Sequence, residues 1–217
     1  MSYTVKEIFL TLQGEGYHTG RAAVFCRFTG CNLWSGREKD RANAVCQFCD
    51  TDFVGTSGTR GGVYTDANAL AQALSDEWQH MNGSCSTRDQ HRFCVLTGGE
   101  PLLQVDEKLV EALHAHGFFI AVETNGTQTA PQGIDWICVS PKADATLILT
   151  QGNELKLVYP QNKAMPEQFS HLQFEHFYVQ PMDGVNVEAY TQQAIAYCLH
   201  HPQWKLGTQV HKRIGIR

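Results

Sequence analysis

The sequence predicts an α/β fold, an abridged partial βα barrel (TIM-like) with about six parallel strands and about three main helices. Short apolar runs rich in Val, Ile and Phe end in Gly, Pro, Asn or Ser, as buried strands do. The connections after Glu123, Val139 and Tyr159 barely reach the roughly 10–12 residues that a helical crossover needs. The predicted strands cover residues 3–12, 22–28, 93–97, 118–123, 135–139, 155–159, 177–180 and 205–210.

Helical periodicity is clear in three segments, each of which has one apolar face. Gly117 is placed to cap the C-terminus of the second helix, and Asn186 to cap the N-terminus of the third. The first face consists of Ala67, Leu70, Leu74, Trp78 and Met81, the second of Val105, Leu109, Ala112 and Leu113, and the third of Val187, Tyr190, Ala194, Tyr197 and Cys198.

Length and composition indicate one folded domain, residues 1–217, with an enlarged loop at about 29–62. Apolar residues make up 42% of the chain, which excludes a disordered protein, and the net charge of −5 argues against a nucleic-acid partner. No apolar run reaches the roughly 18 residues of a membrane helix, and the first residues do not resemble a secretory signal. We therefore expect a cytoplasmic protein whose eight cysteines remain reduced.

Three cysteines lie in the enlarged loop, where fourteen residues separate Cys31 from Cys46 and two separate Cys46 from Cys49. Thiolates are soft ligands that suit iron–sulfur clusters or zinc. A 4Fe–4S cluster normally takes four thiolates, so three would leave one iron open to a ligand that is not protein. A zinc site completed by Cys26 or His18 is the alternative.

The other polar motifs follow predicted strands, which is where the active sites of βα barrels lie. In Gly98-Gly99-Glu100-Pro101 the glycines let the backbone approach a ligand, and Glu100 offers an acceptor for an ammonium group. A plain glycine turn is the alternative. A zwitterionic nucleoside has such an amino group besides a carboxylate, a ribose and a base. The candidates for binding such a cofactor are Phe48, Gly99, Glu100, Glu123, Asn125, Ser140, Lys142 and Gln180.

Candidate substrate-binding residues lie on the first two strands. Gln13 and Glu15 share one side of an extended segment and match the donor-rich edge of a pterin or guanine-like ring, unless the segment is a solvated hairpin arm. Arg27 lies in an otherwise apolar strand, where its guanidinium needs an anion. That anion is either a substrate carboxylate, which Arg binds bidentately, or Glu15.

Two further candidates are less specific. Thr51 follows the cluster loop at Cys49-Asp50-Thr51 and is placed to help hold Mg²⁺, a cation that prefers oxygen ligands. His211, at the end of the last predicted strand, is either a substrate contact or a surface histidine.

The cysteine triplet with Phe48 and the Gly-Gly-Glu-Pro motif resembles the radical S-adenosylmethionine enzymes. The complete set of motifs resembles one of their families, 7-carboxy-7-deazaguanine synthase, including members with an enlarged insert between the first two cysteines. The resemblance is carried by Thr-Leu-Gln-Gly-Glu-Gly at 11–16, Arg27, Cys-Asp-Thr at 49–51, Gly-Gly-Glu-Pro at 98–101, Ser-Pro-Lys at 140–142 and Gln-Val-His-Lys at 209–212.

The resemblance implies conversion of 6-carboxy-5,6,7,8-tetrahydropterin to 7-carboxy-7-deazaguanine and ammonia, on the path to 7-deazapurines such as queuosine. A reduced 4Fe–4S cluster would cleave S-adenosylmethionine, and the 5′-deoxyadenosyl radical would take hydrogen from C6 of the pterin and later return it. Mg²⁺ would bind Thr51 and the substrate carboxylate. An electron donor such as flavodoxin or ferredoxin and a homodimer are also implied.

The resemblance also implies residue roles. Cys31, Cys46 and Cys49 match the cluster ligands, and the substrate would be bound by Leu12, Gln13, Gly14, Glu15, Arg27, Gly98 and His211.

Two other functions fit parts of the sequence. One is an activating enzyme of the same superfamily that installs a glycyl radical on a protein, but it would need no polar pocket of pterin size. The other is a non-enzymatic zinc-binding module, which would contain neither iron nor labile sulfide.

Overall fold

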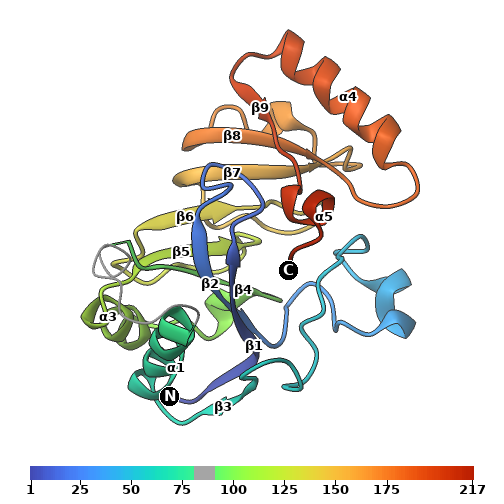
Figure 1. Cartoon of the computed structure of the whole chain (residues 1–217). Coiled ribbons are helices and arrows are strands. Elements are labelled where there is room, and N and C mark those ends of the chain that lie inside the picture. The colour runs from blue at the N-terminus through green and yellow to red at the C-terminus, as the bar shows by residue number, and fades with distance from the viewer. Residues whose placement is uncertain (81–90) are drawn as a thin grey trace.

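The computed structural model describes residues 1–80 and 91–217 (Figure 1). In these residues nine strands form one mostly parallel sheet, with the order β3-β1-β2-β4-β5-β6-β7-β8-β9. The strands are β1 (Tyr3–Leu12), β2 (Ala22–Phe28), β3 (Gly62–Tyr64), β4 (Phe93–Gly98), β5 (Phe119–Thr124), β6 (Trp136–Val139), β7 (Gln151–Tyr159), β8 (Gln173–Pro181) and β9 (Trp204–Leu206).

The seven strands from β2 to β9 in this order run parallel, and β1 is antiparallel to both β2 and β3. Parallel strands carry their carboxyl ends to one edge of the sheet, so the motifs that follow these strands are brought together there. β1 and β2 form a hairpin whose connection, residues 13–21, is closed by a backbone hydrogen bond of 2.8 Å from Gln13 to Arg21.

Few helices accompany the sheet in the described part of the chain: α1 (Ala67–His80), α3 (Glu107–Ala115), α4 (Val187–His200) and the short α5 (Val210–Ile214). The Asp106 side chain caps α3 by accepting from the Leu109 amide at 3.0 Å, and Gly117 adopts the left-handed φ of 76° expected after its end. No helix joins β5 to β6 or β6 to β7, which confirms the short crossovers expected from the sequence.

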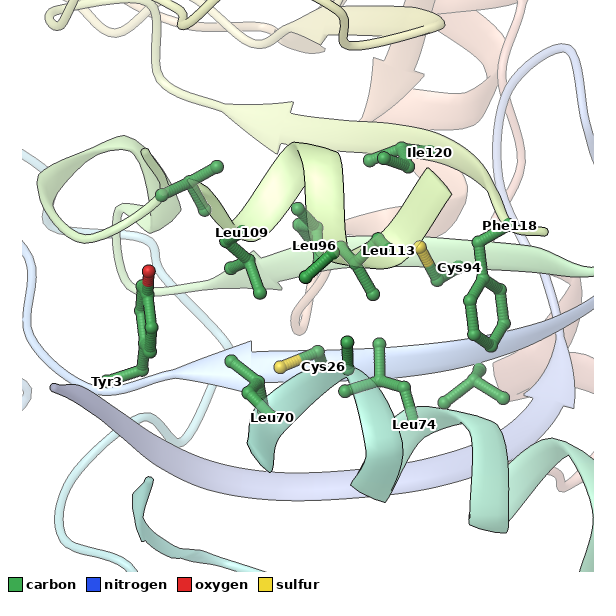
Figure 2. Close-up of a cluster of buried hydrophobic side chains, with 14 of the residues drawn as sticks. Tyr3, Cys26, Leu70, Leu74, Cys94, Leu96, Leu109, Leu113, Phe118 and Ile120 are labelled. Atoms are coloured by element: carbon green, nitrogen blue, oxygen red, sulfur yellow. The ribbon is translucent and has the colours of Figure 1, made fainter. Parts of the chain in front are cut away.

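Alternation along the strands separates two faces of the sheet. Cys26, Cys94, Leu96 and Ile120 pack with α1 and α3 in the main core (Figure 2). Leu155, Leu157, Phe177 and Val179 pack with Ala194 of α4 in a second core on the same face. The neighbouring residues Arg27, Glu123, Glu154, Lys156 and Gln180 therefore point to the face without these helices, where the polar site is built.

Several sequence predictions need correction. The sheet has nine strands, seven of them parallel rather than about six, and three-residue strands such as β3 carry too little periodicity to be recognised. The strand predicted at 205–210 ends at Leu206, and Val210 begins α5, so Gln209 and His211 do not close a strand. Asn186 makes no side-chain capping bond to α4. The position predicted for Met81 lies outside the described residues.

No helix among the described residues is both long and apolar enough to cross a membrane.

Candidate active site

Two adjoining cavities open at the carboxyl ends of the parallel strands. One has a volume of about 200 Å³ and contains all three cysteines of the enlarged loop. The other has a volume of about 270 Å³ and lies against the β1–β2 hairpin and α5. Glu15, Thr51 and Glu123 line both cavities, so the two form neighbouring halves of one site.

The two cavities divide the sequence-predicted residues into two groups. All of these residues except Glu100 line one cavity or the other. The cysteine cavity is lined by Cys31, Cys46, Phe48, Cys49, Gly98, Gly99, Asn125, Ser140, Lys142 and Gln180, the hairpin cavity by Leu12, Gln13, Gly14, Arg27 and His211, and both by Glu15, Thr51 and Glu123.

The cysteine loop is held against the strand ends by close backbone contacts. The Glu100 amide donates to the carbonyl of Gly30 at 2.9 Å, next to Cys31. A Cβ at Gly99 would stand 2.0 Å from the Gly30 oxygen and 3.0 Å from the Cys31 Cβ, so only glycine allows this approach. The thiols of Cys46 and Cys49 interact, and this raises the pKa of Cys46 and lowers the pKa of Cys49 to about 6.

Glu100 lines neither cavity and is fully buried. Its carboxylate accepts hydrogen bonds from the Leu102 amide at 3.0 Å, the Thr124 hydroxyl at 2.7 Å and the Asn125 amide at 2.8 Å. Burial raises the pKa of Glu100, and these hydrogen bonds oppose that shift. Glu100 therefore ties the end of β4 to the end of β5.

Asn125 links the strand ends to the cysteine loop. Its side-chain amide donates to Asn32 Oδ1 at 3.0 Å, and its oxygen accepts from the amide and the hydroxyl of Thr127 at 2.9 and 2.6 Å. Asn32 in turn donates to the Thr127 hydroxyl at 2.7 Å. This closed network fixes the residue next to Cys31 relative to β5.

A buried charge cluster occupies the boundary between the two cavities. Lys156 of β7 forms ion pairs with Glu15 at 2.7 Å and with Glu123 at 2.8 Å. Glu123 also accepts from the Gln13 amide at 3.2 Å, and Glu15 accepts from Gln209 at 2.9 Å. The Lys156 ammonium group thus joins the β1–β2 hairpin to β5 and β7. Gln209, in the segment before α5, joins this cluster through Glu15.

Electrostatics keep Glu15 and Lys156 ionised. Burial alone would raise the pKa of Glu15, but Lys156 and the Gln209 hydrogen bond outweigh it and lower that pKa to about 2. Burial would likewise lower the pKa of Lys156, whereas Cys138, Glu123 and Glu15 raise it well above its usual range. Glu15 therefore accepts hydrogen bonds as an anion at neutral pH.

Lys142, after β6, and Gln180, near the end of β8, lie on either side of β7 in the cysteine cavity. Lys142 donates to the backbone oxygen and the hydroxyl of Ser140, each at 2.6 Å. Burial lowers the pKa of Lys142, although the nearby thiols of Cys46 and Cys49 favour its charged form. Gln180 Oε1 is buried and has no hydrogen-bond partner in the described protein, so this acceptor is available to a ligand.

Arg27 and His211 lie at the hairpin cavity. Arg27 Nε donates to Glu7 at 3.0 Å and Glu15 pairs with Lys156, so the alternative in which Arg27 pairs with Glu15 is wrong. His211 belongs to α5 rather than to a strand and packs over Gly14, where a Cβ would stand 2.2 Å from His211 Nδ1. The Gly14 carbonyl accepts from the Val210 amide at 2.9 Å, which anchors α5 to the hairpin.

The alternative ligands for zinc lie away from the cysteine loop. Cys26 is fully buried in the main core, and His18 packs among Phe93, Phe119 and Trp136. In the described part of the chain, no three His, Cys, Asp or Glu side chains gather closely enough to hold a single metal ion.

Comparison with known proteins gives the family. The chain is 62% identical to 7-carboxy-7-deazaguanine synthase of Caulobacter vibrioides over 216 residues and 63% identical to that of Bradyrhizobium diazoefficiens over 217 residues, covering the full length of both. The chain belongs to the 7-carboxy-7-deazaguanine synthase family. The resemblance inferred from the sequence motifs is therefore confirmed, and the activating-enzyme and zinc-module alternatives lose their support.

A solved structure agrees with this assignment. The crystal structure of QueE from Escherichia coli superposes with a TM-score of 0.70 at 26% identity and covers 97% of this chain and 95% of that one. No protein-family model matches the chain. The α/β fold with a mostly parallel sheet and few helices is therefore shared with QueE.

Sequence reasoning missed several residues of the synthase site. Lys156 lies in Glu154-Leu155-Lys156-Leu157, whose alternation is typical of a strand with one wet face, and nothing local shows that this face lines a cavity. Gln209 is far from Glu15 in the sequence and reaches it only because α5 folds back on the hairpin. A lysine that interrupts apolar residues near the middle of a strand was the only signal for Lys156.

Proposed function

We propose that this chain is a radical S-adenosylmethionine lyase that converts 6-carboxy-5,6,7,8-tetrahydropterin to 7-carboxy-7-deazaguanine and ammonia in queuosine biosynthesis. The observation that carries this proposal is the pair of adjoining cavities. One gathers three thiols, and the other gathers carboxylate, amide and guanidinium groups suited to a carboxylated pterin. Full-length similarity to proteins named as this synthase supports it.

The residues of the first cavity fit a 4Fe–4S cluster and S-adenosylmethionine. Cys31, Cys46 and Cys49 open onto one cavity and would bind the cluster as thiolates, leaving one iron without a protein ligand. When bound, the cluster and its nucleoside would supply the electron transfer and radical chemistry that no side chain provides. Lys142 lines the same cavity as the paired thiols, which favour its charged form, and it would bind the methionine carboxylate.

Two other groups of the same cavity, the unpaired Gln180 oxygen and Gly99, are suited to contact the cofactor. The unpaired Gln180 oxygen would accept from the adenine amine, and Gly99 would allow the backbone to approach the methionyl amine. Phe48 supplies an apolar wall between the paired cysteines. Because both Glu100 oxygens already accept hydrogen bonds, we propose that Glu100 acts chiefly by orienting the ends of β4 and β5.

The second cavity would bind the pterin through anions and one cation. Glu15, which remains ionised beside Lys156, and Glu123 would accept from the donor-rich edge of the ring, and Gln13 donates to Glu123. Arg27 has its Nε fixed by Glu7, which orients the rest of the guanidinium for the substrate carboxylate. His211, the backbone of Leu12 and Gly14, and Gly98 would complete the wall.

Thr51 is placed to bind Mg²⁺ at the boundary of the cavities. Its position next to Asp50 and on the wall of both cavities would let the ion contact the substrate carboxylate as well. Mg²⁺ retains several non-protein oxygens in its shell, which suits a site with few protein ligands.

The finer architecture is a partial barrel, residues 1–217, with the cluster loop at about 29–62 as part of the same domain. Tyr17, at the tip of the β1–β2 hairpin, stacks on His176 of β8 with ring centroids 4.5 Å apart. β2 and β8 are five strands apart, which is about 24 Å across a flat sheet. Such contacts support a sheet that curls around the hairpin.

Three further features are proposed: a homodimer and reduction by flavodoxin or ferredoxin, which the family resemblance implies, and a reducing, cytoplasmic location, which the free cysteines favour. The seven cysteines among the described residues are free thiols, as a reducing compartment favours. Sedimentation of the purified protein tests the dimer, and reduction of the reconstituted cluster by each donor protein tests the donor.

The test of function is an anaerobic assay with the reconstituted protein, reductant, S-adenosylmethionine and the pterin, with and without Mg²⁺. We expect the pterin to be consumed and the deazaguanine to form without any protein substrate, with stimulation by Mg²⁺. Cys46→Ala should abolish both the consumption of the pterin and the formation of the deazaguanine. Failure to turn over the pterin with a fully loaded cluster would contradict the assigned substrate.

A further inference from the structure

The fourteen-residue insert between Cys31 and Cys46 folds around one side chain, Arg41. This arginine lies in a short 3-10 helix, Glu38–Asn43, which buries no residue of its own. Its Nη1 donates to the backbone oxygens of Gln47 at 2.9 Å and Cys49 at 3.0 Å. The insert therefore contacts the Cys-Gln-Phe-Cys turn through two hydrogen bonds from a single nitrogen.

Two other contacts hold the guanidinium in place. Its Nε donates to both Glu38 oxygens, at 2.9 and 2.8 Å, and its carbon lies 4.1 Å from the centre of the Trp34 ring. Trp34 is buried and packs edge-to-face on Phe53, with ring centroids 5.6 Å apart. The Trp34 ring and the Glu38 carboxylate together restrict the conformations of the Arg41 side chain.

The two carbonyl groups that Arg41 binds belong to the turn that carries the paired cysteines. Gln47 and Cys49 lie on either side of Phe48, so fixing both carbonyl directions fixes the backbone that carries Phe48 and the Cys49 thiol. On the other side of the loop, the Val45 and Cys46 amides donate to the Leu33 oxygen at 3.1 and 3.3 Å. The turn is thus held by the insert from both ends.

We propose that Arg41 is a positioning residue that holds the Cys46–Cys49 turn in its cluster-binding conformation. This inference rests on the proposed function, because it assumes that these thiols bind the cluster. The effect is geometric rather than electrostatic, since Glu38 neutralises the guanidinium at 2.8 Å. A lysine at this position would keep the charge but lose the planar group that stacks on Trp34 while donating to two carbonyls and a carboxylate.

The test measures cluster retention rather than turnover. Wild type, Arg41→Met, Arg41→Lys and the control Lys39→Met, an exposed cation of the same 3-10 helix, are reconstituted anaerobically. Iron and sulfide per chain are determined, followed by the rate of iron loss to a chelator. We expect iron loss at least about tenfold faster in both Arg41 variants, since one hydrogen bond from a charged donor is commonly worth that much. Lys39→Met should match wild type.

The outcomes separate this inference from the proposed function. A wild-type protein that takes up no iron–sulfur cluster would contradict the function itself. A loaded wild type with Arg41→Met or Arg41→Lys variants that retain iron equally well would overturn the positioning role; retention by the Lys variant alone would indicate a role for charge instead. Apo-protein unfolding transitions of the variants should match that of the control, and a large loss of global stability would also overturn a role confined to the loop.

Discussion

The buried Lys156 cluster gives the sharpest energetic prediction. Its ammonium group pairs with Glu15 at 2.7 Å and with Glu123 at 2.8 Å, and the lysine side chain is 6% exposed. In Lys156→Met the two carboxylates would face each other without a cation. Removing one partner of a buried ion pair typically costs about 3–5 kcal/mol. We therefore expect the free energy of unfolding to fall by about that amount at pH 7.

The pKa of Glu15 gives an independent estimate. A folded-state pKa of about 2, against an ordinary value of 4.5, corresponds to about 3 kcal/mol of stabilisation at neutral pH. Because the folded pKa is lowered, this contribution is fully present above the ordinary value and is lost as pH falls through about 2. In the variant, Glu15 should protonate more readily, so the difference from wild type should shrink as the pH is lowered from 7 to 4.

The assay is urea unfolding of the apo proteins at pH 7 and pH 4, followed by far-ultraviolet circular dichroism. Lys163→Met is a matched control, because Lys163 pairs with Asp144 at 3.1 Å but both side chains are more than 60% exposed. This exposed pair should contribute less than about 1 kcal/mol. A loss for Lys156→Met no larger than that of the control, or one that does not depend on pH, would refute this reasoning.

Two glycine substitutions test close approaches in the site. Gly99→Ala places a Cβ 2.0 Å from the Gly30 oxygen and should displace Cys31, so cluster content should fall in an iron assay, whereas Gly62→Ala, with nothing within 4 Å, should load normally. Gly14→Ala meets the His211 ring at 2.2 Å and should weaken pterin binding at least about tenfold in anaerobic calorimetry while cluster content stays normal. Equal iron content in Gly99→Ala and Gly62→Ala would contradict the first contact. Unchanged pterin affinity in Gly14→Ala would contradict the second.

Local patterns in the sequence predicted the parallel sheet and most of the site, because strand ends and their polar motifs are adjacent in the chain. The short crossovers after β5 and β6 were visible in the sequence because too few residues separate the strands. The three-residue strands β3 and β9 were missed or misplaced, since their pairing depends on neighbouring strands rather than on their own periodicity.

The partners of charged residues were the least predictable feature. Glu15 was one of two anions considered for Arg27, but the strand register places Glu7 opposite Arg27, and Glu15 in the hairpin pairs with Lys156. These pairings depend on how the hairpin lies against distant strands, and a single sequence carries no local signal for that.

The central claim is that the three loop cysteines hold a 4Fe–4S cluster with one iron open to S-adenosylmethionine. Mössbauer spectroscopy of protein reconstituted with ⁵⁷Fe, recorded before and after S-adenosylmethionine is added, tests it most directly. We predict that one iron site of the cluster differs from the others and changes its isomer shift when the nucleoside binds. Equivalent irons that do not respond to the nucleoside, or a spectrum without a cluster, would contradict the account.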